Sequence, residues 1–408
     1  MQSIKNALAE AFNPLKDEFI QNPYPIYAKL REHDPVHWSE RTHSWLITRY
    51  DDVDSMLKNL TFGKRLQEKA AEGMEMWKDP EFAVLLQSRL DWMLNQDPPD
   101  HTRLRNLVNK AFTPKTVEGL RPHVQEIANA LLDKVQGKKE MELVEEYSFP
   151  LPVTVIAEML GVPASDRDKF RQWTHRMAVT FNLSGSKDSM RDAQKATVEF
   201  MDYLRPLVED RRKNPKPDLI TGLVQAEEEG QKLSVEELLS NAVLILLAGH
   251  ETTVNLIGNG MLALFRHPDQ LKLLLEHPEY IGSAVDEFLR YDSSVQLVRR
   301  VAGDDVEIRD KKIKKGDMVT MLLGAANRDP DHFADPEQLD ITRKNNKYLS
   351  FGAGIHHCLG FALAKLEAEI AIATLLRRYP KLKLADKKVE YKPSPALRGV
   401  KAMHIQIS

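Results

Sequence analysis

The chain of 408 residues is long enough for two or three domains or for one large one, and it can bury a sizeable core. Hydrophobic residues make up 42% and charged residues 29%, which argues against disordered, fibrous and membrane-embedded classes. A net charge of -3 gives no nucleic-acid-binding signature. The single cysteine, Cys358, excludes an internal disulfide, and we expect a reducing, cytoplasmic setting.

The N-terminal stretch does not have the pattern of a signal peptide. Charged residues such as Lys5 and Lys16 interrupt its apolar positions. The longest apolar run, from Ala242 to Ala248, is too short for a bilayer, which takes ~20 residues. We therefore expect no membrane anchor, with residues 1–19 forming an N-terminal extension and residues 20–408 forming the domain.

Most of the chain has the residue spacing of helices. After a short helix near Pro23, the alternating stretches PVHW and SWLIT predict a small hairpin before Tyr50. Apolar residues at helical spacing predict helices over 101–112, 118–135, 150–160, 190–213, 234–266, 268–276, 280–291 and 359–379. A second strand-rich patch runs from Val295 to Met321 and predicts another hairpin. We therefore expect one large, mainly α domain with small β-sheets, of the α+β class.

Two glycine-containing stretches could suggest a nucleotide site. The segment from Gly258 to Ala263 fits GxGxxA, but it lies inside a long helical pattern and follows no strand, so a dinucleotide site is disfavoured. The second stretch, FGAGIHHCLG from Phe351 to Gly360, opens into a helix. Its residue 357 is histidine where a dinucleotide fingerprint requires glycine, so that interpretation fails there as well.

The second stretch places the only cysteine at the start of a helix. Partial positive charge at a helix start favours a thiolate, and glycines allow the backbone to approach a flat, bulky group. A thiolate ligand for haem iron suits this setting, since amide hydrogen bonds to sulfur tune the iron. Zinc fits less well, because adjacent His356, His357 and Cys358 cannot easily surround one ion. A structural or incidental cysteine remains an alternative.

The stretch around Cys358 resembles the haem-binding loop FGxGxHxCxG of the cytochrome P450 family at every specified position. The resemblance implies a cytochrome P450 fold with haem b as cofactor. It implies that Cys358 is the axial iron ligand and that His356 contacts a haem propionate. The other loop residues assigned to the cofactor by this resemblance are Phe351, Gly352 and Gly360.

A second resemblance involves Glu287 and Arg290, which fit the family's ExxR pair. Alone, this spacing is far more often an ion pair on an exposed helix face. The segment AANRDPDHFADPEQLDITR follows it and resembles the family's meander, with Arg343 at its end. The resemblance implies that the pair and the meander stabilise the scaffold beside the haem, which is a structural role.

The middle of the longest predicted helix reads AGHET, from Ala248 to Thr252. A carboxylate beside hydroxyls in a buried apolar helix is costly unless it is satisfied, which makes it a functional candidate. A helix kink would explain the same residues structurally. The family's oxygen-binding groove has the same pattern, which implies that Glu251 and Thr252 deliver protons and that Ala248 and Gly249 line the cofactor site.

Basic residues supply the remaining cofactor contacts. His101 and Arg105 lie one turn apart and would suit an exposed basic helix, but their segment resembles the family's C helix, whose matching pair binds haem propionates. Arg300 aligns with a further propionate partner, and neighbouring Arg299 is the alternative.

The resemblance implies a haem-thiolate monooxygenase that inserts one oxygen atom from O2 into a C–H bond of a lipophilic molecule such as a fatty acid, terpenoid, steroid or polyketide. Electrons would come from a separate ferredoxin or flavodoxin with its reductase. The basic residues expected to face that donor are Arg103, Lys110, Lys115, Lys365 and Arg377. A peroxide-driven fatty-acid hydroxylase or decarboxylase and a non-enzymatic haem-binding sensor are the alternatives.

The positions that the resemblance assigns to the substrate pocket are apolar, although ordinary core packing would give the same residue types. They are Leu244, Leu247, Ala248, Val295, Leu297, Val298 and Leu397. A methionine-containing segment would form an adaptable roof. Its candidate residues are Met74, Met76, Trp77 and Leu94.

Overall fold

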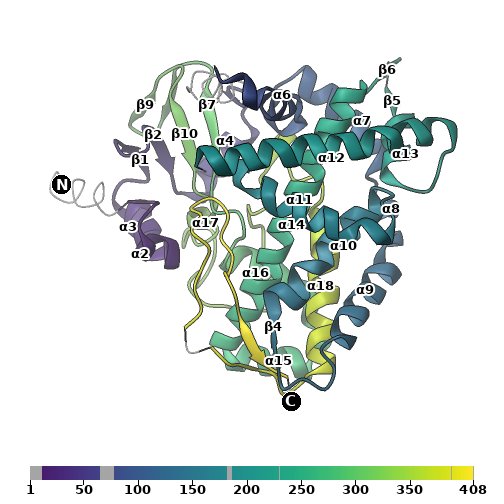
Figure 1. The fold of residues 1–408 in the computed structure, drawn as a ribbon. Coiled ribbons are helices and arrows are strands. Elements are labelled where there is room, and N and C mark those ends of the chain that lie inside the picture. Colours follow the sequence, from purple (N-terminus) through teal and green to yellow (C-terminus); the bar gives the residue numbers. More distant parts are fainter. Residues whose placement is uncertain (1–11, 65–77, 182–185, 229, 387, 408) are drawn as a thin grey trace. The chain divides into compact units, whose positions relative to one another are not determined.

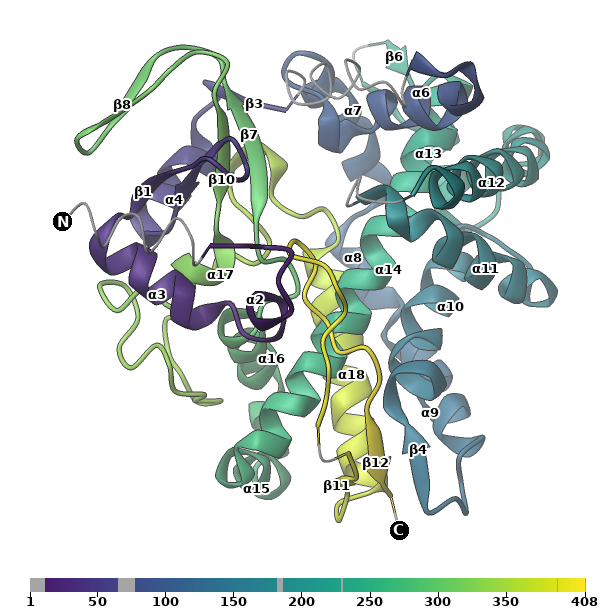
Figure 2. The same ribbon diagram turned by 60° about the vertical axis from the view of Figure 1, so that its left-hand side comes forward.

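The computed structural model describes residues 12–64, 78–181, 186–228, 230–386 and 388–407 (Figures 1 and 2). The chain divides into two compact units. The first comprises Met1–Gly63, Ala128–Ser148 and Thr252–Ser408, and the second comprises Lys64–Ile127 and Phe149–Glu251. The prediction that residues 20–408 form a single domain stays a prediction.

The first unit contains a five-stranded sheet in the order β1-β2-β10-β7-β3. These strands are β1 (Val36–Ser39), β2 (Ser44–Ile47), β10 (Met318–Met321), β7 (Val298–Ala302) and β3 (Phe62–Gly63). The pairing of β2 with β10 is parallel, and the other pairings are antiparallel. The β1–β2 pairing confirms the predicted first hairpin, and its apolar side packs in a core that includes Val36, Ile47 and Met321.

Smaller strand pairs complete the β structure of this unit. Strands β8 (Val306–Ile308) and β9 (Lys311–Ile313) form the predicted second hairpin, whose turn places Arg309 at a φ of 54°. A three-stranded sheet has the order β11-β12-β4. Its members are β11 (Lys383–Leu384), β12 (His404–Gln406) and β4 (Glu140–Glu142), none of which was predicted.

The helices of the first unit are α2 (Asp17–Gln21), α3 (Tyr24–His33), α4 (Tyr50–Lys58), α15 (Pro268–Glu276), α16 (Ile281–Tyr291), α17 (Leu323–Ala326) and α18 (Phe361–Arg378). Helices α3 and α4 both pack against α17, and α16 packs against α18 (Figure 2). Phe12 and Phe19, both in the stretch predicted as an extension, pack edge to face with each other, and Phe19 also contacts Tyr27.

The second unit is almost entirely helical. It contains α6 (Ala83–Asp91), α7 (Asp100–Ala111), α8 (Pro114–Gly119), α10 (Pro150–Met159), α11 (Arg167–Met177), α12 (Lys187–Lys213) and α13 (Leu219–Gln225), with the short strands β5 (Glu227–Glu228) and β6 (Gln231–Lys232). Helices α11 and α12 lie side by side, joined by edge-to-face contacts of Phe170 and Trp173 with Phe200. The boundary between the units falls within α9 (Arg121–Asp133) and α14 (Val235–Arg266).

Helix α14 has 32 residues and is therefore about 48 Å long. It begins with reciprocal capping, because the amide of Glu237 donates to the Ser234 hydroxyl and the amide of Ser234 donates to the Glu237 carboxylate. A Cβ atom at Gly258 would lie 2.8 Å from Val400, and one at Gly260 would lie 2.7 Å from Phe288. Both glycines therefore allow α14 to pack closely against neighbouring side chains.

The predicted helices are confirmed, with ends that differ by a few residues. Among the described residues, seven helices were not predicted, namely α2, α4, α6, α8, α11, α13 and α17. The fold class is confirmed as mainly α with small sheets. Within the ranges that the structure describes, no helix combines the length and the hydropathy that crossing a membrane requires.

Candidate functional site

The loop that carries Cys358 is shaped by two glycines in the left-handed region. Gly352 and Gly354 both have a φ of 69°, which other residues rarely adopt. A Cβ atom at Gly354 would also lie 2.7 Å from the carbonyl oxygen of Leu57 on α4. The backbone amide of Cys358 donates to the carbonyl of Phe351 (2.9 Å), which closes the loop just before α18.

Aromatic side chains surround this loop. The ring of His357 lies 5.0 Å from that of Phe361 and 6.4 Å from that of Phe351. Phe361 keeps 43% of its surface exposed, which is unusual for a large apolar residue at the first position of a helix with a buried face. The cysteine loop therefore borders an exposed aromatic surface.

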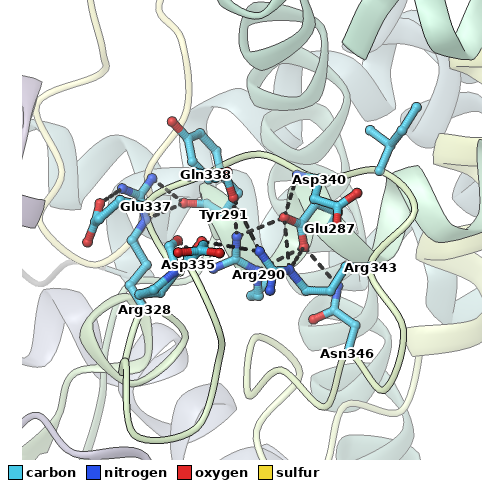
Figure 3. Close-up of polar contacts among 12 residues, drawn as sticks. Glu287, Arg290, Tyr291, Arg328, Asp335, Glu337, Gln338, Asp340, Arg343 and Asn346 are labelled. Atoms are coloured by element: carbon cyan, nitrogen blue, oxygen red, sulfur yellow. Dashed lines mark hydrogen bonds and ion pairs between the residues drawn. The ribbon is translucent and has the colours of Figure 1, made fainter.

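A charge network centred on the buried Glu287 and Arg290 lies at the end of α16 (Figure 3). Both oxygens of Glu287 accept hydrogen bonds from Arg290, each at 2.8 Å, and Arg343 adds a further bond at 3.1 Å. Neither Glu287 nor Arg290 has any exposed surface. This burial excludes the explanation of the Glu287–Arg290 spacing as an ion pair on an exposed face.

The meander residues complete the network through backbone groups and through the side-chain amide of Asn346. Arg290 donates to the carbonyls of Asn327, Pro336 and Gln338, and so connects α16 to three points of the loop. Asn346 and the backbone amide of Asp340 both donate to Glu287, at 3.1 and 2.9 Å. The sequence offered no signal for these last two contacts, because the loop has no periodic pattern.

A second carboxylate of α16 lies next to the network. Asp286 accepts a hydrogen bond from the hydroxyl of Tyr348 (2.7 Å). It also forms an ion pair with Lys365 of α18 (2.6 Å). Burial and the Asp286 charge raise the pKa of Tyr348 above its ordinary value. Lys365, predicted to face an electron donor, is thus engaged within the protein.

The predicted propionate partners fall in both units. In the first unit, Arg300 is buried on β7, whereas neighbouring Arg299 is exposed, as expected for adjacent residues of a strand. His356 is half-buried in the cysteine loop. In the second unit, His101 is buried and Arg105 is half-buried, both on α7. Which of Arg300 and Arg299 contacts a propionate stays a prediction.

The centre of α14 holds a narrow strip that is not fully buried. Every residue from Leu238 to Leu264 is buried except four. The half-buried residues are Ala248, Gly249, Glu251 and Thr252. Their spacing of three or four residues places them on one side of the helix. The strip therefore coincides with the four residues that the motif assigned to the cofactor and to proton delivery.

Two residues in and beside the strip, Gly249 and His250, contact other parts of the second unit. The ring of His250 packs edge to face against Phe149 at 4.3 Å, within the second unit. A Cβ atom at Gly249 would lie 2.6 Å from Ile156 Cδ1, so this glycine also permits close packing of α14 on α10. Glycine at position 249 is thus explained by helix packing as well as by its predicted place at the cofactor site.

A buried carboxyl group that the sequence analysis did not single out lies on α18. Glu367 is 1% exposed and hydrogen-bonds with Thr253 of α14, within the first unit. Burial raises the pKa of Glu367 well above its ordinary value of 4.5, and the Thr253 hydroxyl offsets this only in part. Adjacent threonines therefore differ: Thr252 lies in the half-buried strip, and Thr253 contacts a buried acid.

The predicted substrate-pocket residues are partly brought together. Val295 and Leu397 form an isolated antiparallel bridge, and Val298 begins β7 three residues after Val295. Leu297 packs beside the core that contains Tyr24. On α14, Leu244 and Leu247 are buried, as core residues would be. Leu94 is half-buried in the second unit, whereas Met74, Met76 and Trp77 lie outside the described residues.

The basic residues predicted to face an electron donor fall into two groups, one bound within the protein and one exposed. Arg103 is bound to Glu237 of α14, and this hydrogen bond raises the pKa of Arg103. Lys110, Lys115 and Arg377 are exposed.

Comparison with known proteins then decides the family. The family model described as Cytochrome P450 matches residues 56–402. Cytochrome P450 CYP107DY1 of Priestia megaterium is 44% identical over 93% of this chain and 95% of its own length. The chain belongs to the cytochrome P450 family.

Other relatives of this P450 cover nearly the whole chain as well. The polyketide biosynthesis cytochrome P450 PksS of Bacillus subtilis is 40% identical over 97% of this chain and 98% of its own length. A crystal structure of P450BioI in complex with an acyl carrier protein that bears hexadec-9Z-enoic acid is also similar. It has a TM-score of 0.89 and 40% identity, and the match covers 96% of this chain and 99% of that one.

This P450 is a monooxygenase whose cofactor is haem, iron protoporphyrin IX. The residues present fit that cofactor. Haem brings its own equatorial nitrogen ligands, so a single thiolate such as Cys358 suffices where zinc would need several protein ligands. The left-handed Gly352 and the small, half-buried Ala248 of α14 are each residues at which a flat ring can approach the backbone.

Proposed function

We propose that this P450 inserts one atom of O2 into a C–H bond of a lipophilic substrate of the fatty-acyl or polyketide class, with electrons from a separate ferredoxin or flavodoxin. The observation that carries the proposal is the half-buried strip of α14, in which Glu251 and Thr252 are the polar members. An acid and an alcohol at the incompletely buried centre of an apolar helix are suited to proton delivery.

Residues of this chain would hold the cofactor at several points. Cys358 supplies the thiolate to iron, and the propionates take charged or hydrogen-bonding partners from His356, Arg300, His101 and Arg105. When bound, haem supplies the activation of O2 and the oxidation of the C–H bond. The protein holds the substrate and controls where protons enter.

Proton delivery would use the two polar residues of the strip in sequence. The Glu251 carboxyl group would take up a proton from solvent. The Thr252 hydroxyl would donate a hydrogen bond toward the site where O2 binds, while its own oxygen accepts one. The adjacent Thr253, which contacts Glu367, would not take part.

The substrate class rests on the apolar residue types at the predicted pocket and on two relatives. PksS is a polyketide biosynthesis enzyme, and P450BioI has been solved with a fatty-acyl carrier protein. Both relatives support a long, lipophilic substrate, and the second supports delivery on a carrier protein. Hydrophobic contacts at Val295 and Leu397 would select its shape.

Turnover assays test this proposal directly. Reduced protein with carbon monoxide should show the strongly red-shifted Soret band of thiolate ligation, and Cys358→Ala should lose it. A library of fatty acids, acyl carrier proteins and polyketides is then scored by the ferric spin-state shift, followed by product analysis with labelled O2. Turnover only with peroxide would favour the peroxide-driven alternative, and no turnover with any donor would favour a haem-binding sensor.

Thr252→Ala and Thr253→Val form a matched pair for the proton step. We expect Thr252→Ala to divert most of the electrons to peroxide, because proton delivery is lost while the fold is kept. Thr253→Val should keep coupling close to that of the unmodified protein. The measurement is product formed per NADPH consumed, together with peroxide released. Equal coupling in both variants would contradict the assignment of Thr252.

The electron donor is expected at the surface beside the cysteine loop, where exposed Phe361 is near the start of α18. Lys110, Lys115 and Arg377 are the predicted basic contacts that remain exposed. If an acidic ferredoxin binds there, the rate at which it reduces this P450 should fall as ionic strength rises. A reduction rate that does not change with salt would contradict an electrostatic docking surface. We expect the enzyme and its donor in the reducing cytoplasm.

A further inference from the structure

A buried carboxylate directly after α16 is the centre of a second polar network, distinct from that of Glu287. Asp292 accepts hydrogen bonds from the hydroxyl of Tyr24 (2.7 Å) and from Nε of Arg398 (2.6 Å) on one oxygen. Its other oxygen accepts from the hydroxyl of Tyr391 (2.9 Å). Two segments distant in sequence, one around Tyr24 and one from Tyr391 to Arg398, therefore converge on Asp292.

Arg398 uses all three of its nitrogen groups in this network. Besides the bond to Asp292, it donates to the carbonyls of Ile20 (2.7 Å) and Gln21 (3.1 Å) on α2. Its guanidinium lies 3.4 Å from the centre of the Tyr391 ring. Burial alone would raise the pKa of Asp292, but the Arg398 charge and the Tyr24 hydroxyl outweigh it and hold the pKa below its ordinary value.

Helix α14 is attached to the same network through Asn259. The amide nitrogen of Asn259 donates to the backbone carbonyl of Asp292 (3.2 Å) and to that of Arg398 (3.0 Å). Asn259 is 1% exposed. The backbones on both sides of the ion pair are therefore fixed to one buried side chain.

The network lies next to two segments that carry predicted substrate contacts. The amide of Arg398 donates to the carbonyl of Ser294 (2.8 Å), and the amide of Gln296 donates to that of Ala396 (2.8 Å). Between these bonds, Val295 and Leu397 face each other in the antiparallel bridge. Since side chains alternate along extended backbone, Arg398 points away from the side on which Leu397 lies.

On the segment that contains Val295, the side chain of Gln296 likewise points toward the polar network. Its amide nitrogen donates to the Tyr24 hydroxyl (3.1 Å) and to the carbonyl of Ser293 (2.8 Å). Polar Gln296 and Arg398 thus both reach the network, each directly beside an apolar residue of the bridge. A shift of Asp292 or Arg398 would move Val295 and Leu397 with it.

We propose that the buried Asp292–Arg398 ion pair is the positioning element that fixes the Val295–Leu397 bridge and thereby determines which substrate shapes this P450 accepts. The proposal rests on the proposed function, in which Val295 and Leu397 contact the substrate. A buried ion pair is often replaceable without loss of stability, so its geometry matters here more than its energy. Displacements of about 1 Å in positioning groups can change rates by about a hundredfold.

The test compares two nitrogen ligands that bind haem iron in the purified holoenzyme. Imidazole is small, whereas 4-phenylimidazole carries a ring that must fit among the pocket residues. The ratio of their dissociation constants, read from the Soret shift, measures pocket shape independently of turnover. The variants are Asp292→Asn and Arg398→Lys, with Tyr391→Phe as a milder change that keeps the ion pair.

We expect Asp292→Asn and Arg398→Lys to change the 4-phenylimidazole constant by about tenfold, with the imidazole constant within about twofold. Lysine at position 398 should not restore the original ratio, because it lacks the planar guanidinium that reaches three acceptors. Tyr391→Phe should change the ratio in the same direction by about threefold. If Asp292→Asn does not fold, Tyr391→Phe alone supports or overturns the proposal.

Asp218→Asn is the matched control, because Asp218 forms a buried ion pair with Arg211 in the second unit, away from the bridge segments in sequence. This variant should leave the ratio unchanged. An equal change in Asp218→Asn, or none in Tyr391→Phe and Asp292→Asn, overturns the positioning role and leaves the proposed function standing. If Leu397→Ala and Val295→Ala leave 4-phenylimidazole binding unchanged, the pocket assignment in the proposed function fails, and the positioning role fails with it.

Discussion

Two glutamates are buried within the unit that contains the cysteine loop, and they are stabilised in opposite ways. Glu287 of α16 is bonded to two arginines, an asparagine and a backbone amide. Glu367 of α18 hydrogen-bonds with one threonine hydroxyl, and burial raises its pKa well above 4.5. Charge pairing stabilises Glu287, whereas burial at Glu367 favours the protonated acid.

The difference teaches that burial alone does not tell what a carboxyl group does. A buried charge is tolerated only when it is paired and hydrogen-bonded, and otherwise the group becomes neutral. At Glu287 the pairing also connects α16 to the meander, so the network stabilises a loop that has no regular structure of its own (Figure 3). At Glu367 the contact joins only two helices.

The largest effect should follow from Glu287→Ala. It leaves Arg290 and Arg343 without their carboxylate in a buried site, which costs about 3–5 kcal/mol of unfolding free energy. We expect little folded, haem-loaded protein. The measurement is the yield of haem-bound protein together with urea unfolding of what is recovered.

A surface pair provides the control for that loss. Lys58 and Asp54 form an ion pair on α4 in which the lysine side chain is 58% exposed. Lys58→Ala should cost no more than about 1 kcal/mol, since exposed pairs contribute little. If Glu287→Ala were as mild as Lys58→Ala, the network would not support the meander.

The two glutamates also show how far the sequence could predict the site. Glu287 was found because the ExxR pattern and the meander motif carry it. Glu367 was missed although its position held a signal: it lies four residues after Leu363 and three before Ile370, on the apolar face of α18. A carboxyl group on a buried helix face predicts either a pairing partner or a raised pKa.

The fold shows the same limits. Helix α14 was predicted because its centre is a continuous apolar run, whereas α11 was missed because charged residues hide the spacing of Phe170, Trp173 and Met177. The bonds of Asn346 to Glu287 and of Arg398 to Asp292 span 59 and 106 residues. Such contacts follow from tertiary packing, on which local pattern carries no information.

A smaller effect is expected from Asn346→Ala. It removes one hydrogen bond to Glu287 and leaves both arginines in place, so the loss should be about 1.5–3 kcal/mol, as for a bond to a charged group. Thermal unfolding at one pH measures it. A loss as large as that of Glu287→Ala would mean that the amide, not the charge pairing, determines the stability of the site.

The smallest effect should come from Glu367→Gln, and its sign should depend on pH. Because burial raises the pKa in the folded state, the folded protein keeps a proton that the unfolded chain releases above about pH 4.5. The stabilising contribution is therefore complete below that pH and is lost progressively as pH rises toward the folded-state pKa. Glutamine resembles the protonated acid and does not titrate.

The unfolding free energy of Glu367→Gln should thus lie within about 1 kcal/mol of the unmodified protein near pH 5 and exceed it increasingly toward pH 8. Urea unfolding at several pH values measures the difference, and Glu32→Gln, at an exposed position of α3, serves as the control. A difference of the opposite slope would mean that Glu367 is ionised in the folded protein. The two buried glutamates would then be stabilised by the same means, and an unrecognised cationic or hydrogen-bonding partner would have to lie beside Glu367.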